Sequence, residues 1–172
     1  GIAIAVSLLV FFIVVSKQNF QFLIIIIELA SLAISIATFS LVWNARWNAK
    51  DTFLAAIGFS FLFTAVLDAF FTIALIDSSV LRDLTMDNSI QLWIAARYLQ
   101  CITLLVAFLL IGRTLTEDGK YDTTILALPY AAITGVFLFS ILFSNIFPAC
   151  DTFNGGYTLF KIASEVVISI IL

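Results

Sequence analysis

The sequence predicts an all-α integral membrane protein, a polytopic bundle of about six transmembrane helices. Hydrophobic residues make up 63% of the chain and charged residues only 11%, and the mean hydropathy of +1.17 lies far above that of soluble domains. The apolar stretches are continuous over about 20 residues, the length of a membrane-crossing helix, whereas the strands of membrane barrels alternate over about 10. The composition therefore predicts helices rather than a barrel.

The expected helices are long apolar runs joined by short polar connections. We expect them at residues 1–15, 22–43, 52–76, 90–112, 123–147 and 157–172. The first run is short for a span, but no small-residue cleavage site follows it, so we interpret it as the remainder of a first helix rather than as a signal peptide. The chain begins at Gly1 instead of Met and ends inside an apolar run. We therefore expect a single transmembrane domain, residues 1–172, from a longer protein.

The basic residues of the connections favour a cytoplasmic N-terminus. The connections after the second and fourth helices carry Arg46, Lys50, Arg113 and Lys120, and those after the first and third carry Lys17 and Arg82. Because cytoplasmic loops are enriched in lysine and arginine, the second and fourth connections are expected on the cytoplasmic side. Six helices would then return the C-terminus to the cytoplasm as well.

Five ionisable residues lie within the apolar runs: Glu28, Asp68, Arg97, Lys161 and Glu165. A charge at bilayer depth costs roughly 2.5 to 3.5 kcal/mol, so it normally faces a protein interior or a watery cavity and marks a site. Counted along the helices, all but Lys161 lie about 10 to 12 Å below the outer surface. Lys161 precedes Glu165 by one helical turn and can pair with it. The sequence therefore predicts opposite charges at one level of the bundle.

The sequence leaves two interpretations of this predicted cluster open. In the first, Arg97 bridges two carboxylates and holds the helices together. In the second, the charges form a pocket that binds or senses a signal from the outer side, and the neighbouring Trp93 and Tyr98 line it. Stripes of serine and threonine along the same helices suit either interpretation, because small hydroxyl residues also let membrane helices pack closely.

Several function classes are not supported by the residues. The chain contains no histidine, no glycine-rich phosphate loop and no nucleophile with a recognisable partner, so we predict no catalytic residue and no metal-ligand set. The net charge of −3 is spread over the loops and indicates no nucleic-acid partner. A transporter or ion-conducting module is the alternative to a sensor, although inverted repeats and broken helix pairs are missing. A structural subunit of a larger membrane complex is a second alternative.

Short stretches of the sequence resemble one known family. They are ELAS at 28–31, LVWNAR at 41–46, LDAFFT at 67–72, QLWIAARY at 91–98, FPAC at 147–150, GYT at 156–158 and FKIASE at 160–165. In this order they look like the bacterial and archaeal membrane-associated sensor domain of the third type. The resemblance covers roughly residues 20–170, which makes it far more specific than any single motif.

The resemblance implies a sensory input domain in the cytoplasmic membrane of a prokaryote. Such domains are joined to a cytoplasmic histidine kinase of a two-component system, a diguanylate cyclase or a related output module in the same polypeptide. Membrane lipids are then partners, and a homodimer is expected because output modules generally act as pairs. Family members commonly carry histidines where this chain has Phe71 and near Ile24. Since this chain has none, we do not expect haem or an imidazole-bound metal, and the signal remains open.

Overall fold

A computed structural model describes residues 19–49, 52–76, 85–110, 126–144, 146–151 and 156–172. These residues form the helices α2 (Phe20–Ala49), α3 (Thr52–Ile76), α4 (Met86–Leu110), α5 (Ala127–Phe139) and α6 (Leu159–Ile171), and a π-helical turn η3 (Ser140–Ser144) continues α5. The described residues contain no strand, only an isolated bridge between Asp151 and Tyr157. The all-helical fold class is therefore confirmed for this part of the chain. The expected first helix, 1–15, lies outside the described residues.

Four of the helices in the described part of the chain are long and apolar enough to cross a membrane. They run over Phe20–Ala45, Thr52–Ile76, Met86–Leu109 and Ala127–Ser144. The fifth, α6, has 13 described residues and covers about 20 Å at 1.5 Å per residue, which is less than the hydrocarbon thickness of a bilayer. The count of six spans and the cytoplasmic N-terminus remain predictions.

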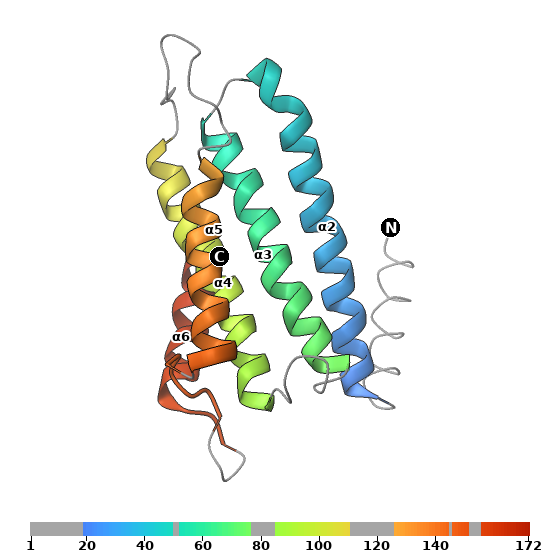
Figure 1. Cartoon of the computed structure of the whole chain (residues 1–172), viewed down its shortest axis with the longest axis vertical. Coiled ribbons are helices and arrows are strands. Elements are labelled where there is room, and N and C mark those ends of the chain that lie inside the picture. Colours follow the sequence, from blue (N-terminus) through green and yellow to red (C-terminus); the bar gives the residue numbers. More distant parts are fainter. Residues whose placement is uncertain (1–18, 50–51, 77–84, 111–125, 145, 152–155) are drawn as a thin grey trace.

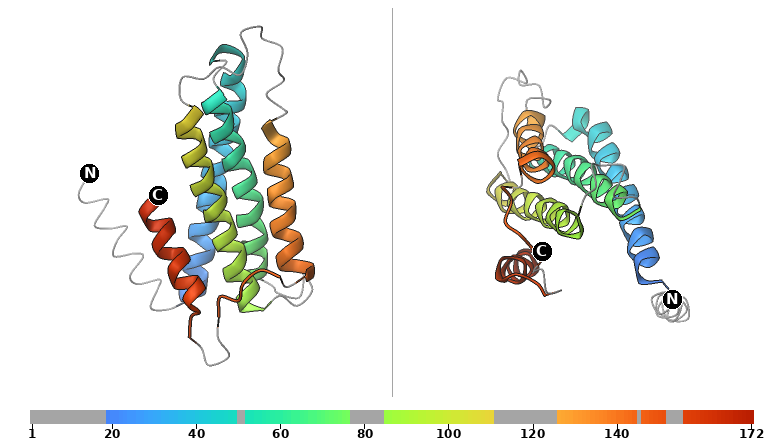
Figure 2. Two further views of the ribbon diagram at one scale, coloured as in Figure 1. Left: turned by 90° about the vertical axis from the view of Figure 1, so that its left-hand side faces the viewer. Right: turned by 60° about the horizontal axis from the view of Figure 1, so that its bottom comes forward.

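Helix α3 lies at the centre of the bundle. It packs between α2 and α4, and α5 lies against both α3 and α4 (Figure 1). Helix α6 contacts α4 on the outside of the bundle, as two further views show (Figure 2). Small residues on α3, among them Ala55, Ala56, Gly58 and Ser60, are buried, and such residues let neighbouring membrane helices approach closely.

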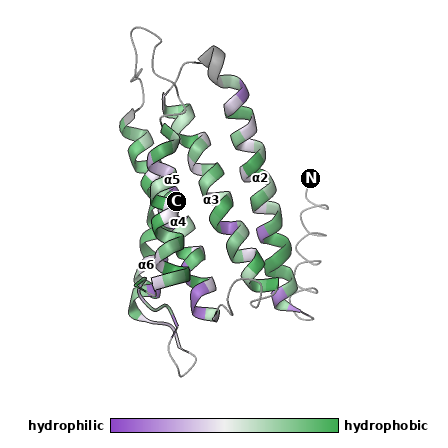
Figure 3. Cartoon of the chain, in the orientation of Figure 1, coloured by the Kyte–Doolittle hydropathy of each residue, from purple (hydrophilic) through white to green (hydrophobic). Residues whose placement is uncertain are grey.

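The core lies where α3 and α4 meet the end of α5. It is formed by Leu67, Phe71, Leu92, Ala95, Ala96, Leu99 and Ile141. The outward faces are also apolar, and hydrophobic colour covers most of the helices with only a few hydrophilic positions between their ends (Figure 3). Exposed side chains such as Ile34, Leu41 and Phe108 are suited to contact lipid, because a bilayer offers the apolar surroundings that water does not.

A candidate charged site between three helices

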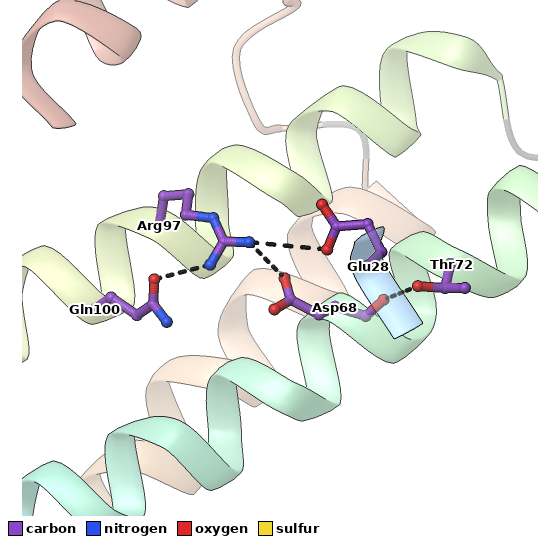
Figure 4. A network of polar contacts seen from close by, with 5 residues as sticks. All are labelled: Glu28, Asp68, Thr72, Arg97 and Gln100. Atoms are coloured by element: carbon purple, nitrogen blue, oxygen red, sulfur yellow. Dashed lines mark hydrogen bonds and ion pairs between the residues drawn. The ribbon is translucent and has the colours of Figure 1, made fainter. Parts of the chain in front are cut away.

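The centre of the candidate site is Arg97 of α4, which faces one carboxylate from each of two neighbouring helices. Its Nη2 atom lies 3.8 Å from Oε2 of Glu28 on α2 and 3.6 Å from Oδ1 of Asp68 on α3 (Figure 4). These are ion-pair distances, too long for direct hydrogen bonds. Side-chain exposure is 0% for Asp68, 9% for Glu28 and 15% for Arg97. Three helices therefore contribute to one buried charge cluster, which we call the Glu28–Asp68–Arg97 triad.

The helices bring these residues together because consecutive spans run in opposite directions. Glu28 lies roughly two turns after the start of α2, and Asp68 lies roughly two turns before the end of α3. Arg97 lies roughly three turns into α4. All three therefore lie toward the same end of the bundle. Counting residues along each helix could predict this shared depth, but not which side chains face one another.

Two neighbours on α4 orient Arg97. Its Nη1 donates a 2.8 Å hydrogen bond to Oε1 of Gln100, and its guanidinium carbon lies 5.6 Å from the centre of the Trp93 ring, within the range of a cation–π contact. Both partners are one helical turn away, the spacing at which side chains of one helix meet. Of the aromatic residues predicted beside Arg97, Trp93 thus lies at the triad.

The carboxylates of the triad have few partners among the described residues. Both carboxylate oxygens of Asp68, and Oε2 of Glu28, are buried without a hydrogen bond. The hydroxyl of Thr72, one turn further along α3, donates to the backbone oxygen of Asp68 at 2.7 Å rather than to its carboxylate. Two carboxylates face a single guanidinium, so the fully ionised triad would carry an excess negative charge in surroundings where unpaired charge is costly.

The other two predicted charges form a separate pair on α6. Nζ of Lys161 lies 3.1 Å from Oε1 of Glu165 one turn later, so the intrahelical ion pair predicted from their spacing is confirmed. Lys161 also lies over the ring of Tyr157 at 3.3 Å from its centre. The side chain of Glu165 is 42% exposed. Among the described residues, the structure joins neither member of this pair to Arg97.

Tyr98 is directed away from the triad, toward α6. Its hydroxyl donates a 2.9 Å hydrogen bond to Oγ of Ser164, which in turn donates to the backbone oxygen of Phe160 at 2.7 Å. Adjacent residues of α4 therefore contact different helices: Arg97 faces α2 and α3, and Tyr98 faces α6. This link between the helices was not predicted from the sequence, which carries no signal for the partner of a lone tyrosine.

A small pocket adjoins the triad at Gln100. It has a volume of about 120 Å³ and is lined by Ile57, Ser60, Phe61, Gln100, Thr103, Leu104 and Leu172. Gln100 therefore contacts Arg97 on one side and the pocket on the other. Gln100 lies one turn after Arg97 in the sequence but was not among the predicted site residues.

Hydrogen bonds also join Asp87 to the loop before α6, and the sequence did not predict this contact. Oδ1 of Asp87, in the first turn of α4, accepts hydrogen bonds from the backbone N–H groups of Cys150 at 2.6 Å and Asp151 at 2.7 Å. Its Oδ2 accepts one from Gln91 at 2.8 Å. An acidic residue near a helix start is a recognisable capping signal, but its loop partner is 63 residues away. The buried Cys150 thiol has its pKa raised to about 12, by burial first and by the negative charge of Asp87 second.

The fold and the triad define a membrane-spanning helical bundle with an ion cluster in its interior. In the described part of the chain, no group of three or more histidine, cysteine, aspartate or glutamate residues is placed to hold a metal ion. The family model of the membrane-associated sensor domain, MASE3, matches residues 15–172, so the chain belongs to this family. This confirms the resemblance seen in the sequence. No curated protein and no solved structure gives a significant match.

Proposed function

We propose that this membrane-associated sensor domain detects its signal through the Glu28–Asp68–Arg97 triad. The observation that supports this role is the position of one guanidinium 3.8 and 3.6 Å from carboxylates of two other helices. Because neither contact is a short hydrogen bond, a change in charge or a competing polar group can alter the balance of the cluster with little loss of directional bonding. The triad is then a point where a signal changes how α2, α3 and α4 pack.

The signal would pass to α6 through α4. Arg97 and Tyr98 are adjacent, and Tyr98 holds Ser164 of α6 by a hydrogen bond. A shift or rotation of α4 at the triad therefore moves the contact that docks α6. We propose that α6 conveys this change to a cytoplasmic output module of the same polypeptide, a histidine kinase or a diguanylate cyclase, in the cytoplasmic membrane of a prokaryote. Pairing of two chains through their output modules belongs to the same proposal.

The test uses the full-length protein in membranes, with the activity of its own output module as the readout. Asp68→Asn and Arg97→Gln should shift the basal output and remove its response, because each removes one of the three ionisable groups that form the triad. Ser40→Ala is the matched control, since this residue is exposed and its hydroxyl, among the described residues, bonds to the backbone oxygen of Ile36 in its own helix. Unchanged output in both triad variants would overturn the proposal.

A second variant tests the proposed link between the triad and α6. Tyr98→Phe leaves the triad intact and removes the hydrogen bond to Ser164, so it should weaken the response of the output module while the triad remains assembled.

A flux measurement separates the sensor from the transport alternative. A sensor should show no substrate-driven flux across liposomes that contain the purified protein. Ion or solute flux that is lost in Asp68→Asn would instead favour a transporter.

A further inference from the structure

The charge balance of the triad indicates what it binds. Among the described residues, α2 contributes Glu28, α3 contributes Asp68 and α4 contributes Arg97, so two acidic groups face one basic group. The other titratable side chains near these helices include Cys101 on α4 and Tyr130 on α5, and both types are uncharged at neutral pH. None of these groups offsets the second carboxylate.

Three further charges, on helical residues whose side chains the structure describes, have partners elsewhere. Lys161 and Glu165 on α6 balance each other at 3.1 Å. Asp87, at the start of α4, accepts hydrogen bonds from the backbone of Cys150 and Asp151. The excess charge therefore belongs to the triad itself. An uncompensated charge in the interior of a membrane protein is strongly unfavourable, and a buried carboxylate avoids it by taking up a proton.

The environment of Asp68 supports the same conclusion. Its side chain is 0% exposed, and neither of its carboxylate oxygens has a hydrogen-bond partner among the described residues. Oδ1 of Asp68 and Oε2 of Glu28 both lie within 4 Å of the same nitrogen atom of Arg97, so the two carboxyl groups face a common point (Figure 4). Two carboxyl groups that share one site commonly hold one proton between them.

A metal cation fits this site less well than a proton. The described residues offer no third histidine, cysteine, aspartate or glutamate ligand beside the two carboxylates, and hard cations require six or more oxygen ligands. The guanidinium of Arg97 would also lie next to any added cation and repel it. A proton needs no coordination shell and adds to one carboxylate oxygen.

We propose that Glu28 and Asp68 together bind one proton from water, which makes the triad electrically neutral. The proton adds to a carboxylate oxygen, and its release restores two carboxylates against one guanidinium. Because the two groups are coupled, the proton belongs to the pair rather than to either residue alone. This inference rests on the proposed function and names the proton as the ligand of the sensor. Release of the proton would drive the two carboxylates apart and loosen α2 from α3.

Infrared spectroscopy of the full-length protein in lipid membranes tests this stoichiometry. A protonated carboxyl group has a characteristic carbonyl band that shifts in D₂O, and at neutral pH we expect one such group per chain from the triad. Glu28→Gln and Asp68→Asn should each abolish this band, because the remaining carboxylate is then balanced one to one by Arg97. Arg97→Gln should increase it about twofold, because both carboxyl groups are then without a cation. Glu165→Gln should leave the band unchanged.

Two outcomes would overturn the proton site. One is the absence of a triad band in the unaltered protein at neutral pH, and the other is a band that persists in both single amide variants. The two amide variants suffice even if Arg97→Gln does not fold, and circular dichroism verifies their helix content. Output activity is measured on the same membranes. A missing band with output that still depends on Asp68 refutes the proton alone, whereas a band with unaffected output refutes the sensory role alone.

Discussion

Gly58 of α3 lies directly against Val42 of α2. A Cβ atom added to Gly58 would lie 2.6 Å from Cγ1 and 2.9 Å from Cβ of Val42, closer than carbon atoms can approach without strain. The rings of Phe39, Trp43 and Phe59 pack together in the same region, with centres 5.7 to 6.1 Å apart. The two helices are therefore packed tightly here, roughly four turns along α2 from Glu28.

Substitution of this glycine should weaken the α2–α3 packing. In Gly58→Ala the added methyl group would overlap Val42, and overpacking of this kind costs about 1 to 3 kcal/mol. The expected result is a lower unfolding temperature in detergent or lipid. Gly135→Ala is the matched control, because nothing lies within 4 Å of the added Cβ and alanine favours a helix by about 1 kcal/mol over glycine. Equal stability of the two variants would contradict this account of the contact.

Removal of the Asp87 carboxylate should release the loop before α6. Asp87→Ala leaves the backbone N–H groups of Cys150 and Asp151 without their acceptor, at a cost of about 1 to 3 kcal/mol if these groups stay buried. Amide hydrogen exchange should therefore accelerate at residues 150 and 151. Asp87→Asn keeps one acceptor oxygen and should have a smaller effect. Exchange rates unaffected by Asp87→Ala would show that these hydrogen bonds do not hold the loop.

The Cys150 thiol should be unreactive in the folded protein. With its pKa raised to about 12, roughly a thousandfold less thiolate is present near pH 8 than for an ordinary cysteine. Alkylation of Cys150 in a Cys101→Ala background should therefore be slow until the protein is unfolded. Fast labelling of the folded protein would contradict the burial of this thiol.

The same shift of the Cys150 pKa predicts a pH dependence of stability. Between about pH 9 and pH 12 the unfolded chain ionises this thiol while the folded chain keeps it protonated, so the unfolded state is favoured increasingly as the pH rises. The stability that the protonated thiol contributes to the folded state is fully present below about pH 9 and is lost progressively as the pH rises to about 12. Cys150→Ala should unfold with a weaker dependence on pH in this range, and an identical pH profile would oppose the prediction.

The Tyr98–Ser164 hydrogen bond should contribute measurably to the docking of α6. Tyr98→Phe and Ser164→Ala should each destabilise the protein by about 1 kcal/mol. Because the two side chains bond to each other at 2.9 Å, the double variant should cost less than the sum of the single variants. Strictly additive effects in thermal unfolding would show that the two hydroxyl groups act independently.

The helices themselves could be predicted closely because each is a continuous apolar run. The helix expected at 52–76 is found at Thr52–Ile76, and that expected at 157–172 is found at Leu159–Ile171. The observed helix ends differ from the expected ones where polar residues continue a helix. Helix α2 extends to Ala49 rather than ending at 43, and α4 begins at Met86 rather than at 90. Local hydrophobicity indicates where a span exists but does not determine its terminal turn.

Interactions within one helix could also be predicted, whereas between helices only the contact of Arg97 with two carboxylates was expected, as one of two interpretations of the charges. The Lys161–Glu165 ion pair follows from a spacing of one turn, which fixes the neighbours of a helical side chain. The contacts of Asp87 with Cys150 and Asp151, and the pocket beside Gln100, join residues from distant parts of the chain. Their formation depends on how the helices pack, which no local pattern encodes.

Composition, hydrophobic pattern and short motifs were enough to predict a membrane-spanning helical domain of the sensor family whose buried charges lie at similar depth. The packing of the helices then shows which side chains meet: Arg97 lies beside Glu28 and Asp68, one of the two arrangements that the sequence left open, while Tyr98 bonds to Ser164. This difference arises because adjacent residues of a helix point about 100° apart. The neighbour that each one meets is therefore set by which helix packs on that face.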